Sequence, residues 1–227
     1  MASEFINQVQ QLLERIPPVT RYALISMITL TVLCLCELLS LSQYALSFHS
    51  VFYKRELYRL ISNFLFVGTK FDFVFNLYSL YQHGSFLENH VFQRNTKSYI
   101  IYLLKIILII DTFSLLSGIG SFLFSSLSCA MAYTWSLYNA YQTVQVFFVF
   151  QLPGKYLPYC LLGMSLISGG LGALIVSGFG ILAGLIVSKL GSLQPNSGFS
   201  VHAPSNHSTT SERSSTAFKG RGKRLGG

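Results

Sequence analysis

The sequence predicts an all-α, polytopic membrane protein with about six transmembrane helices, and its composition is the first ground for this prediction. Hydrophobic residues make up 51% of the 227 and charged residues only 11%, with a mean hydropathy of +0.50. A soluble domain carries roughly 25% charged residues because its surface must be solvated. The apolar residues lie mainly within residues 22–190, whereas 195–227 is rich in Ser, Asn, Gly, Arg and Lys. The apolar part is therefore expected to face lipid.

Residues 1–21 are expected to form an interfacial amphipathic segment that ends at Pro17 and Pro18. Its apolar side chains recur at helical spacing: Phe5, Val9, Leu12, Leu13 and Ile16. The first span is predicted at residues 22–41, which is long enough to cross a bilayer and longer than the core of a signal peptide. Residues 42–60 carry too much charge to span and are expected to form a loop with short interfacial helices.

Further apolar runs predict spans at residues 71–84, 99–116 and 121–141. Residues 144–150 alternate and precede Pro153 and Gly154, so an extended piece is expected there. The run 156–190 is too long for one span, and glycines interrupt it. Two short helices with a break near residues 169–172 are predicted.

The basic residues predict the orientation, because cytosolic loops of membrane proteins carry an excess of Lys and Arg. With the N-terminus in the cytosol, most basic residues lie on that side, and only Lys54, Arg55 and Arg59 clearly oppose it. An even number of spans returns residues 191–227 to the cytosol as a disordered tail. The net charge of +8 is spread over these positions and does not line one helix face, which argues against nucleic-acid binding.

Four cysteines lie inside apolar runs, away from zinc-site spacing: Cys34, Cys36, Cys129 and Cys160. Buried thiols of this kind behave as small hydrophobic side chains. We expect no metal site, no cofactor and no disulfide framework.

Five stretches occur in the order found in one family: Ile16 to Arg21, Phe52 to Arg59 with the following Asn63, Asn76 to Gln82 with Leu87-Glu88, Tyr156 to Gly163, and Gly180 to Gly184. Together they make the chain resemble the Derlin (Der1-like) family over residues 10–190. The resemblance implies a six-helix, rhomboid-like bundle without enzymatic activity, a pseudoprotease, in the endoplasmic reticulum membrane. It also implies retrotranslocation of misfolded proteins by local membrane thinning, together with an ER ubiquitin ligase complex, other copies or related chains, and the valosin-containing AAA ATPase.

Four ionisable residues are expected at or inside hydrocarbon depth: Lys70, Asp72, Lys105 and Asp111. Such groups usually face protein or water, and short spans are accommodated by thinning the bilayer. The alternative is that Lys105 snorkels and that Lys70 and Asp72 lie at the lumenal interface.

An active rhomboid protease is the alternative in another functional class, since it needs a serine activated by a histidine. Rhomboids carry Gly-x-Ser-Gly on the fourth helix and the histidine on the sixth. Here the fourth span has Ser125 to Cys129 without flanking glycines, and the last span has no histidine. A serine in a membrane helix is more often a packing residue.

The resemblance also assigns structural roles. Tyr58 and Arg59 stand where the family has Trp-Arg and are expected to anchor the first loop near the headgroups. Gly180 and Gly184 are expected to pack the sixth helix against the fourth, because glycines four apart permit close approach.

The tail carries a separate motif at residues 218–226. Phe218, Gly220, Gly222 and Leu225 match the F-x-G-x-G-x-x-L pattern of the SHP box, which in Derlins binds the AAA ATPase. Two apolar anchors in an extended, glycine-containing segment suit a peptide-binding groove. The alternative is a basic tail that touches anionic lipid.

Two other functions remain open. A Derlin-derived component of a secondary-plastid import translocon would use the same parts. A small transporter should show internal repeats, which the sequence lacks.

Overall fold

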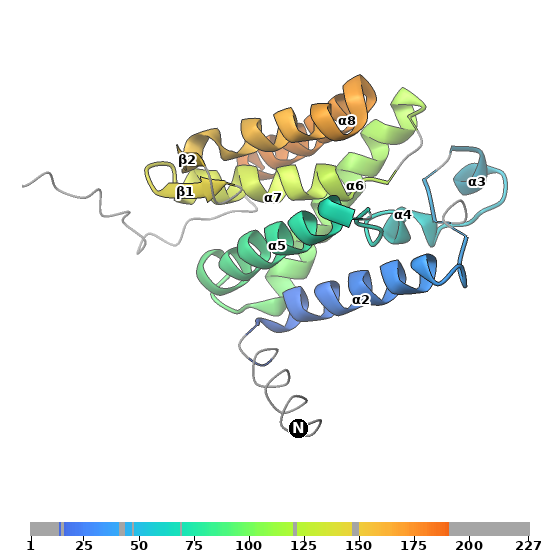
Figure 1. Ribbon diagram of the computed structural model, residues 1–227, viewed down its shortest axis with the longest axis horizontal. Helices are drawn as coiled ribbons and strands as arrows, with labels where there is room; N and C mark the ends of the chain where they lie inside the picture. Colours follow the sequence, from blue (N-terminus) through green and yellow to red (C-terminus); the bar gives the residue numbers. More distant parts are fainter. Residues whose placement is uncertain are drawn as a thin grey trace, which may run out of the picture.

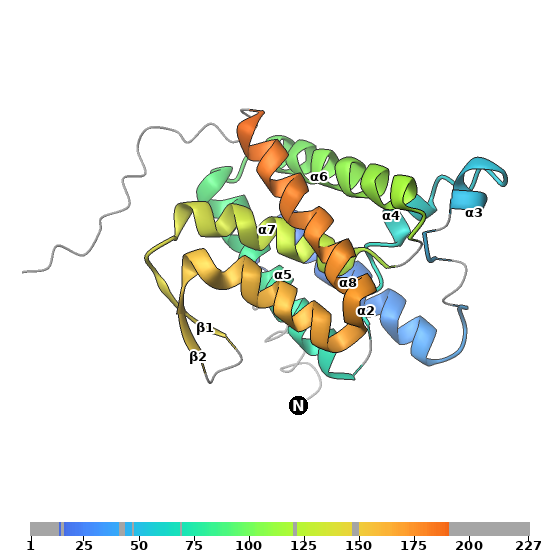
Figure 2. The same ribbon diagram turned by 90° about the horizontal axis from the view of Figure 1, so that it is seen from above.

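The computed structural model describes residues 14, 16–40, 44–46, 48–68, 70–119, 122–146 and 150–190. The long helices are α2 (Pro18–Leu35), α5 (Lys70–Phe86), α6 (Thr96–Ser117), α7 (Phe124–Tyr138) and α8 (Leu157–Lys189) (Figures 1 and 2). The shorter elements are α3 (Phe48–Phe52), α4 (Arg59–Ser62), the π-helix Leu87–Val91, the strands β1 (Thr143–Val146) and β2 (Phe150–Pro153), and the 3₁₀ turn Gly154–Tyr156. The predicted interfacial helix before Glu14 and the predicted tail lie outside the described residues.

Three helices within the described residues are long and apolar enough to cross a membrane: Pro18–Leu35, Thr96–Ser117 and Gly154–Lys189. This mostly helical architecture agrees with the predicted polytopic helical membrane protein. Helices α5 and α7 are shorter, with 17 and 15 residues. A straight span of a typical bilayer takes about 20 residues.

The first long helix is displaced from its predicted position at residues 22–41. It begins at Pro18, since proline is well tolerated in the first helical turn, where its missing N–H costs no hydrogen bond. It ends at Leu35, and Glu37 then adopts a left-handed conformation with φ of 59°. The predicted bounds of this span, residues 22–41, were therefore wrong: it begins four residues earlier and ends six residues earlier.

The later elements agree more closely with prediction. Helices α3 and α4 are the short helices expected in the first loop. The extended piece expected at residues 144–150 is represented by strands β1 and β2, and their antiparallel pairing, with Val144 opposite Leu152, was not predicted. The predicted break in the last apolar run is confirmed: Gly170 has φ of 68° and ψ of −161°, which only glycine adopts readily. Figure 2 shows the two limbs of α8 meeting at a sharp bend.

Helix α7 lies at the centre of the bundle, in contact with α5, α6 and α8 (Figure 1). Most of its side chains are buried, including the small residues Ala130 and Ala132. On the α6 side, Tyr102 donates a hydrogen bond to the hydroxyl of Thr134 on α7 at 2.7 Å. Small side chains on the central helix let the three neighbouring helices approach it closely. A buried hydroxyl such as that of Thr134 costs little free energy when it has a hydrogen-bond partner.

Candidate functional site

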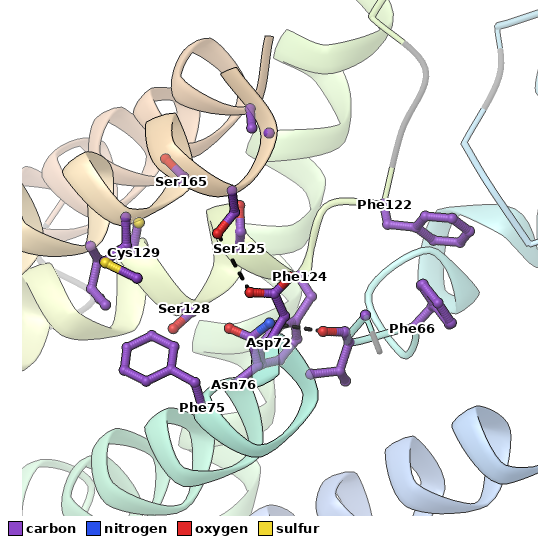
Figure 3. Close-up of a pocket in the computed structure, with 17 residues that line it drawn as sticks. Phe66, Asp72, Phe75, Asn76, Phe122, Phe124, Ser125, Ser128, Cys129 and Ser165 are labelled. Atoms are coloured by element: carbon purple, nitrogen blue, oxygen red, sulfur yellow. Dashed lines mark hydrogen bonds between the residues drawn. The ribbon is translucent and has the colours of Figure 1, made fainter. Parts of the chain in front are cut away.

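A partly open cavity of about 400 Å³ lies between α5, α7 and the first limb of α8 (Figure 3). Helix α5 contributes Asp72, Phe75 and Asn76. The wall on α7 and on the first limb of α8 includes Ser125, Ser128, Cys129, Leu161, Met164, Ser165 and Ser168. Hydroxyls and one carboxylate therefore share the cavity with aromatic and aliphatic side chains.

The mouth of the cavity lies where α5 begins and α8 bends. The hydroxyl of Ser168 donates to the carboxylate of Asp72 at 3.4 Å, and this contact joins the first turn of α5 to the residues before the Gly170 kink. The side-chain amide of Asn76 donates to the carbonyl of Val67 at 2.8 Å and so holds the preceding loop against α5 (Figure 3).

A chain of hydrogen bonds leads from the cavity into α5. The hydroxyls of Ser128 and Ser79 are 2.8 Å apart, and the Ser79 hydroxyl lies 3.1 Å from Nδ1 of His83. The Nε2 atom of His83 is buried without a hydrogen-bond partner within the described residues. The ring centroids of His83 and Trp135 are 5.9 Å apart, and the two rings are arranged edge to face. This arrangement was not predicted from the sequence, because the base of a serine protease was expected on the last helix. The spacing of Ser79 and His83, four residues apart on one helix face, was the available signal.

The glycine pair lies against α7. A Cβ atom added at Gly180 would overlap the backbone of Ser126, and one added at Gly184 would lie 3.0 Å from Cδ1 of Tyr133 and 3.2 Å from the Ala130 carbonyl. The Ser126 hydroxyl donates to the carbonyl of Val176 at 2.6 Å across the same contact. Helices α7 and α8 are thus in backbone contact along this face.

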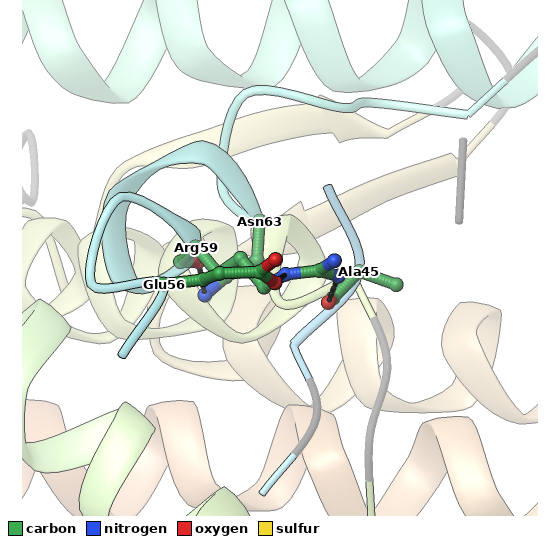
Figure 4. A network of polar contacts seen from close by, with 4 residues as sticks. All are labelled: Ala45, Glu56, Arg59 and Asn63. Atoms are coloured by element: carbon green, nitrogen blue, oxygen red, sulfur yellow. Dashed lines mark hydrogen bonds and ion pairs between the residues drawn. The ribbon is translucent and has the colours of Figure 1, made fainter. Parts of the chain in front are cut away.

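In the first loop, Arg59 is buried and Tyr58 is exposed. The Arg59 guanidinium donates to the carbonyl of Ala45 at 2.9 Å and to the Glu56 carboxylate at 2.6 Å (Figure 4). It also lies 5.9 Å from the Tyr58 ring centre. Arg59 therefore ties the chain before α3 to the start of α4.

The two acids that were expected at membrane depth, Asp72 and Asp111, differ in their surroundings. Asp111 on α6 is buried and accepts a hydrogen bond from the Asn63 amide at 3.2 Å. Asp72, in contrast, is exposed at the cavity mouth. The Lys105 side chain is exposed on α6, and the side chain of Lys70 lies outside the described residues. Buried Asp111 thus links the first loop to α6.

The structure does not test the tail motif. The tail residues Phe218, Gly220, Gly222 and Leu225 are outside the described residues. Across the described ranges, no three His, Cys, Asp or Glu side chains form a group that would hold a metal ion.

The chain is similar to known proteins over most of its length. The model of the Der1-like family matches residues 16–205. An uncharacterized derlin-like protein of Schizosaccharomyces pombe is 49% identical over 226 residues, which covers all of both chains. Derlin-2.1 of Zea mays is 28% identical over 82% of this chain and 79% of its own, and Derlin-1 of Drosophila melanogaster is 30% identical over 64% and 61%. The chain belongs to the Der1-like (Derlin) family.

Proposed function

We propose that this protein is a non-enzymatic retrotranslocation factor of the endoplasmic reticulum membrane, which helps misfolded proteins reach the cytosol for degradation. Membership of the Derlin family supports the proposal. The observation that carries it is the polar, partly open cavity between α5 and the first limb of α8. Such a cavity offers hydrogen bonds to a polar segment that would otherwise be stranded in hydrocarbon.

The lengths of the helices around the cavity support local thinning of the bilayer. The first limb of α8 runs from Leu157 to the kink at Gly170, about 20 Å at 1.5 Å per residue. Helix α7, with 15 residues, covers about 22 Å on the same basis. Both fall short of the roughly 30 Å hydrocarbon core of a typical bilayer, and short spans are accommodated by thinning it. Thinning beside the cavity shortens the path of a polar chain through lipid.

The rest of the proposal concerns topology and partners. We place the helices in a rhomboid-like six-helix arrangement, with both limbs of α8 as separate spans and both termini in the cytosol. The SHP box at residues 218–226 then recruits the valosin-containing AAA ATPase, which supplies the pulling force. An ER membrane ubiquitin ligase complex marks the emerging substrate.

The cavity makes the proposal testable in cells from which the gene has been deleted. Ser165 lines the cavity, so Ser165→Trp should fill it and fail to restore rapid degradation of a misfolded membrane protein. Ile167 is 79% exposed on the same limb, so Ile167→Trp is the matched control and should restore it. Expression and melting temperature of both variants should be compared first. Full restoration by a stably folded Ser165→Trp would refute the role of the cavity.

A serine hydrolase is the second candidate, because a hydrogen-bonded chain begins at Ser128 in the cavity wall and leads through Ser79 to His83. It is the weaker one, since Ser79 stands between the cavity serine and the histidine. A hydrolytic serine needs a base within direct hydrogen-bond reach. Labelling with a fluorophosphonate separates the two candidates.

A further inference from the structure

The cavity carries a single formal charge. Of the described residues that line it, Asp72 alone has a carboxyl or basic side chain, and the other polar groups are hydroxyls, one amide and one thiol. Its carboxylate receives one hydrogen bond from a described residue, the long 3.4 Å contact with Ser168. A carboxylate has about four acceptor positions, so most of the acceptor capacity of Asp72 is not used by the described residues.

The lining beside Asp72 has the chemical composition of a site for a long cationic side chain. Phe75, Leu161 and Met164 provide apolar surface, and Ser125, Ser165 and Ser168 provide hydroxyls. Lysine and arginine combine an apolar stem with a charged head, so they match an apolar wall that ends at a carboxylate. Methionine adapts its shape to different partners, which suits a site that receives varied sequences.

Asp72 also lies in the first turn of α5, where the helix dipole favours a negative charge. This interaction with the dipole of α5 does not depend on contact between Asp72 and α8. The structure nevertheless brings the α8 kink beside this carboxylate and leaves the cavity open next to it. The two roles are separable, because only a ligand-binding role depends on the charge of the segment inside the cavity.

We infer that the cavity selects polypeptide segments that carry lysine or arginine among apolar residues, with Asp72 as the pairing group at the mouth. The inference rests on the proposed function and names the class of substrate segment that the site takes. A basic residue inside an apolar segment marks a chain that cannot settle stably in a bilayer, because an unpaired charge there is costly. Pairing with Asp72 supplies the counter-charge.

The test uses the full-length protein in phosphatidylcholine vesicles, with a photoreactive amino acid at Met164 in the cavity wall. The probes are single-span peptides of leucine and alanine with one central Lys, Gln, Glu or Leu. The Lys peptide should be captured about tenfold more than the Gln peptide, a ratio that one favourable ion pair supplies. Asp72→Asn should bring this ratio to about one, and Asp72→Glu should retain it. Asp72→Lys should favour the Glu peptide instead.

A photoreactive group at Ile167, on the exposed face of the same limb, is the matched control and should capture all peptides equally. Capture of the Leu peptide at position 164 reports whether the cavity admits polypeptide at all, which tests the proposed function separately. Equal capture of the Lys and Gln peptides, or an unchanged ratio in Asp72→Asn, would overturn the inference. So would loss of the ratio on adding phosphatidylethanolamine, because the bound cation would then be a lipid amine.

Discussion

The carboxylate of Glu88 accepts hydrogen bonds from both the backbone N–H and the hydroxyl of Thr20, each at 2.9 Å. The same carboxylate accepts from the N–H of Val19 at 3.0 Å. These N–H groups lie in the first turn of α2, where no partner exists inside the helix. Glu88, fully buried in the π-helix after α5, therefore caps a helix that begins nearly seventy residues earlier.

Glu88→Ala should destabilise the protein by about 3 kcal/mol, because it leaves buried donors of α2 without an acceptor. The melting temperature in detergent micelles measures this loss. Thr20→Val removes only the hydroxyl donor and should cost about 1 kcal/mol, so it serves as a graded control. A Glu88→Ala protein that melts like the wild type would show that the cap does not support the bundle.

The contact of the α8 glycines with α7 predicts which glycine substitutions destabilise the protein and which do not. Gly180→Ala should destabilise by about 3 kcal/mol, because the new methyl group meets the backbone of Ser126, which cannot rotate away. Gly178→Ala is the control and should be nearly neutral, since among the described residues nothing outside the adjacent turns of its own helix lies within 4 Å of the added Cβ. Gly184→Leu should also damage folding, and size-exclusion chromatography should show loss of the compact species. A stable but inactive Gly184→Leu protein would point to a binding role instead.

The absence of protease activity is also a prediction. The Ser128→Ala and Ser126→Ala variants should both restore degradation of a misfolded substrate in cells from which the gene has been deleted. The Ser126 variant should lose about 1 kcal/mol of stability with its bond to Val176. Purified wild-type protein should not react with a fluorophosphonate probe. Labelling that disappears in both Ser128→Ala and His83→Ala would establish a serine hydrolase.

The tail should bind the ATPase through its two apolar residues. A peptide of residues 214–227 should bind the ATPase N-terminal domain in the micromolar range, about −8 kcal/mol. Phe218→Ala combined with Leu225→Ala should abolish binding, because a peptide that must become ordered depends on a few buried side chains. Neutralising the basic residues should only weaken it, in a salt-dependent way. Equal binding of the double-alanine peptide would leave the segment as a charged tail.

The orientation predicts that the sequon at Asn206 stays unmodified. The motif Asn206-His207-Ser208 is a glycosylation acceptor only in the lumen. With the tail in the cytosol, treatment with a glycosidase should leave the mass of the native protein unchanged. A mass shift that is absent in Asn206→Gln would place the tail in the lumen and require an odd number of spans.

The elements that sequence analysis predicted well depend on local features. Helix α6 was expected at residues 99–116 and runs from Thr96 to Ser117, because an uninterrupted apolar run leaves few choices. The α8 kink follows from neighbouring glycines in a run too long for one span. The bounds of α2 were wrong because Pro18 has two opposite meanings, a helix stop or a first-turn residue. The Glu88 cap decides between them, and it comes from a distant part of the chain.

The sequence by itself determined a helical membrane protein of the Derlin type, since composition, apolar run length and motif order are properties of the linear chain. Only the tertiary structure decided which polar side chains meet. It placed Ser79 and His83 behind Ser128, Asn63 beside Asp111, and Asp72 beside the bend of α8. The physical reason is that hydropathy and helix propensity add up locally, whereas these pairs depend on the rotation and depth of each helix against its neighbours. Packing of small residues such as Gly180 and Ala130 sets that register.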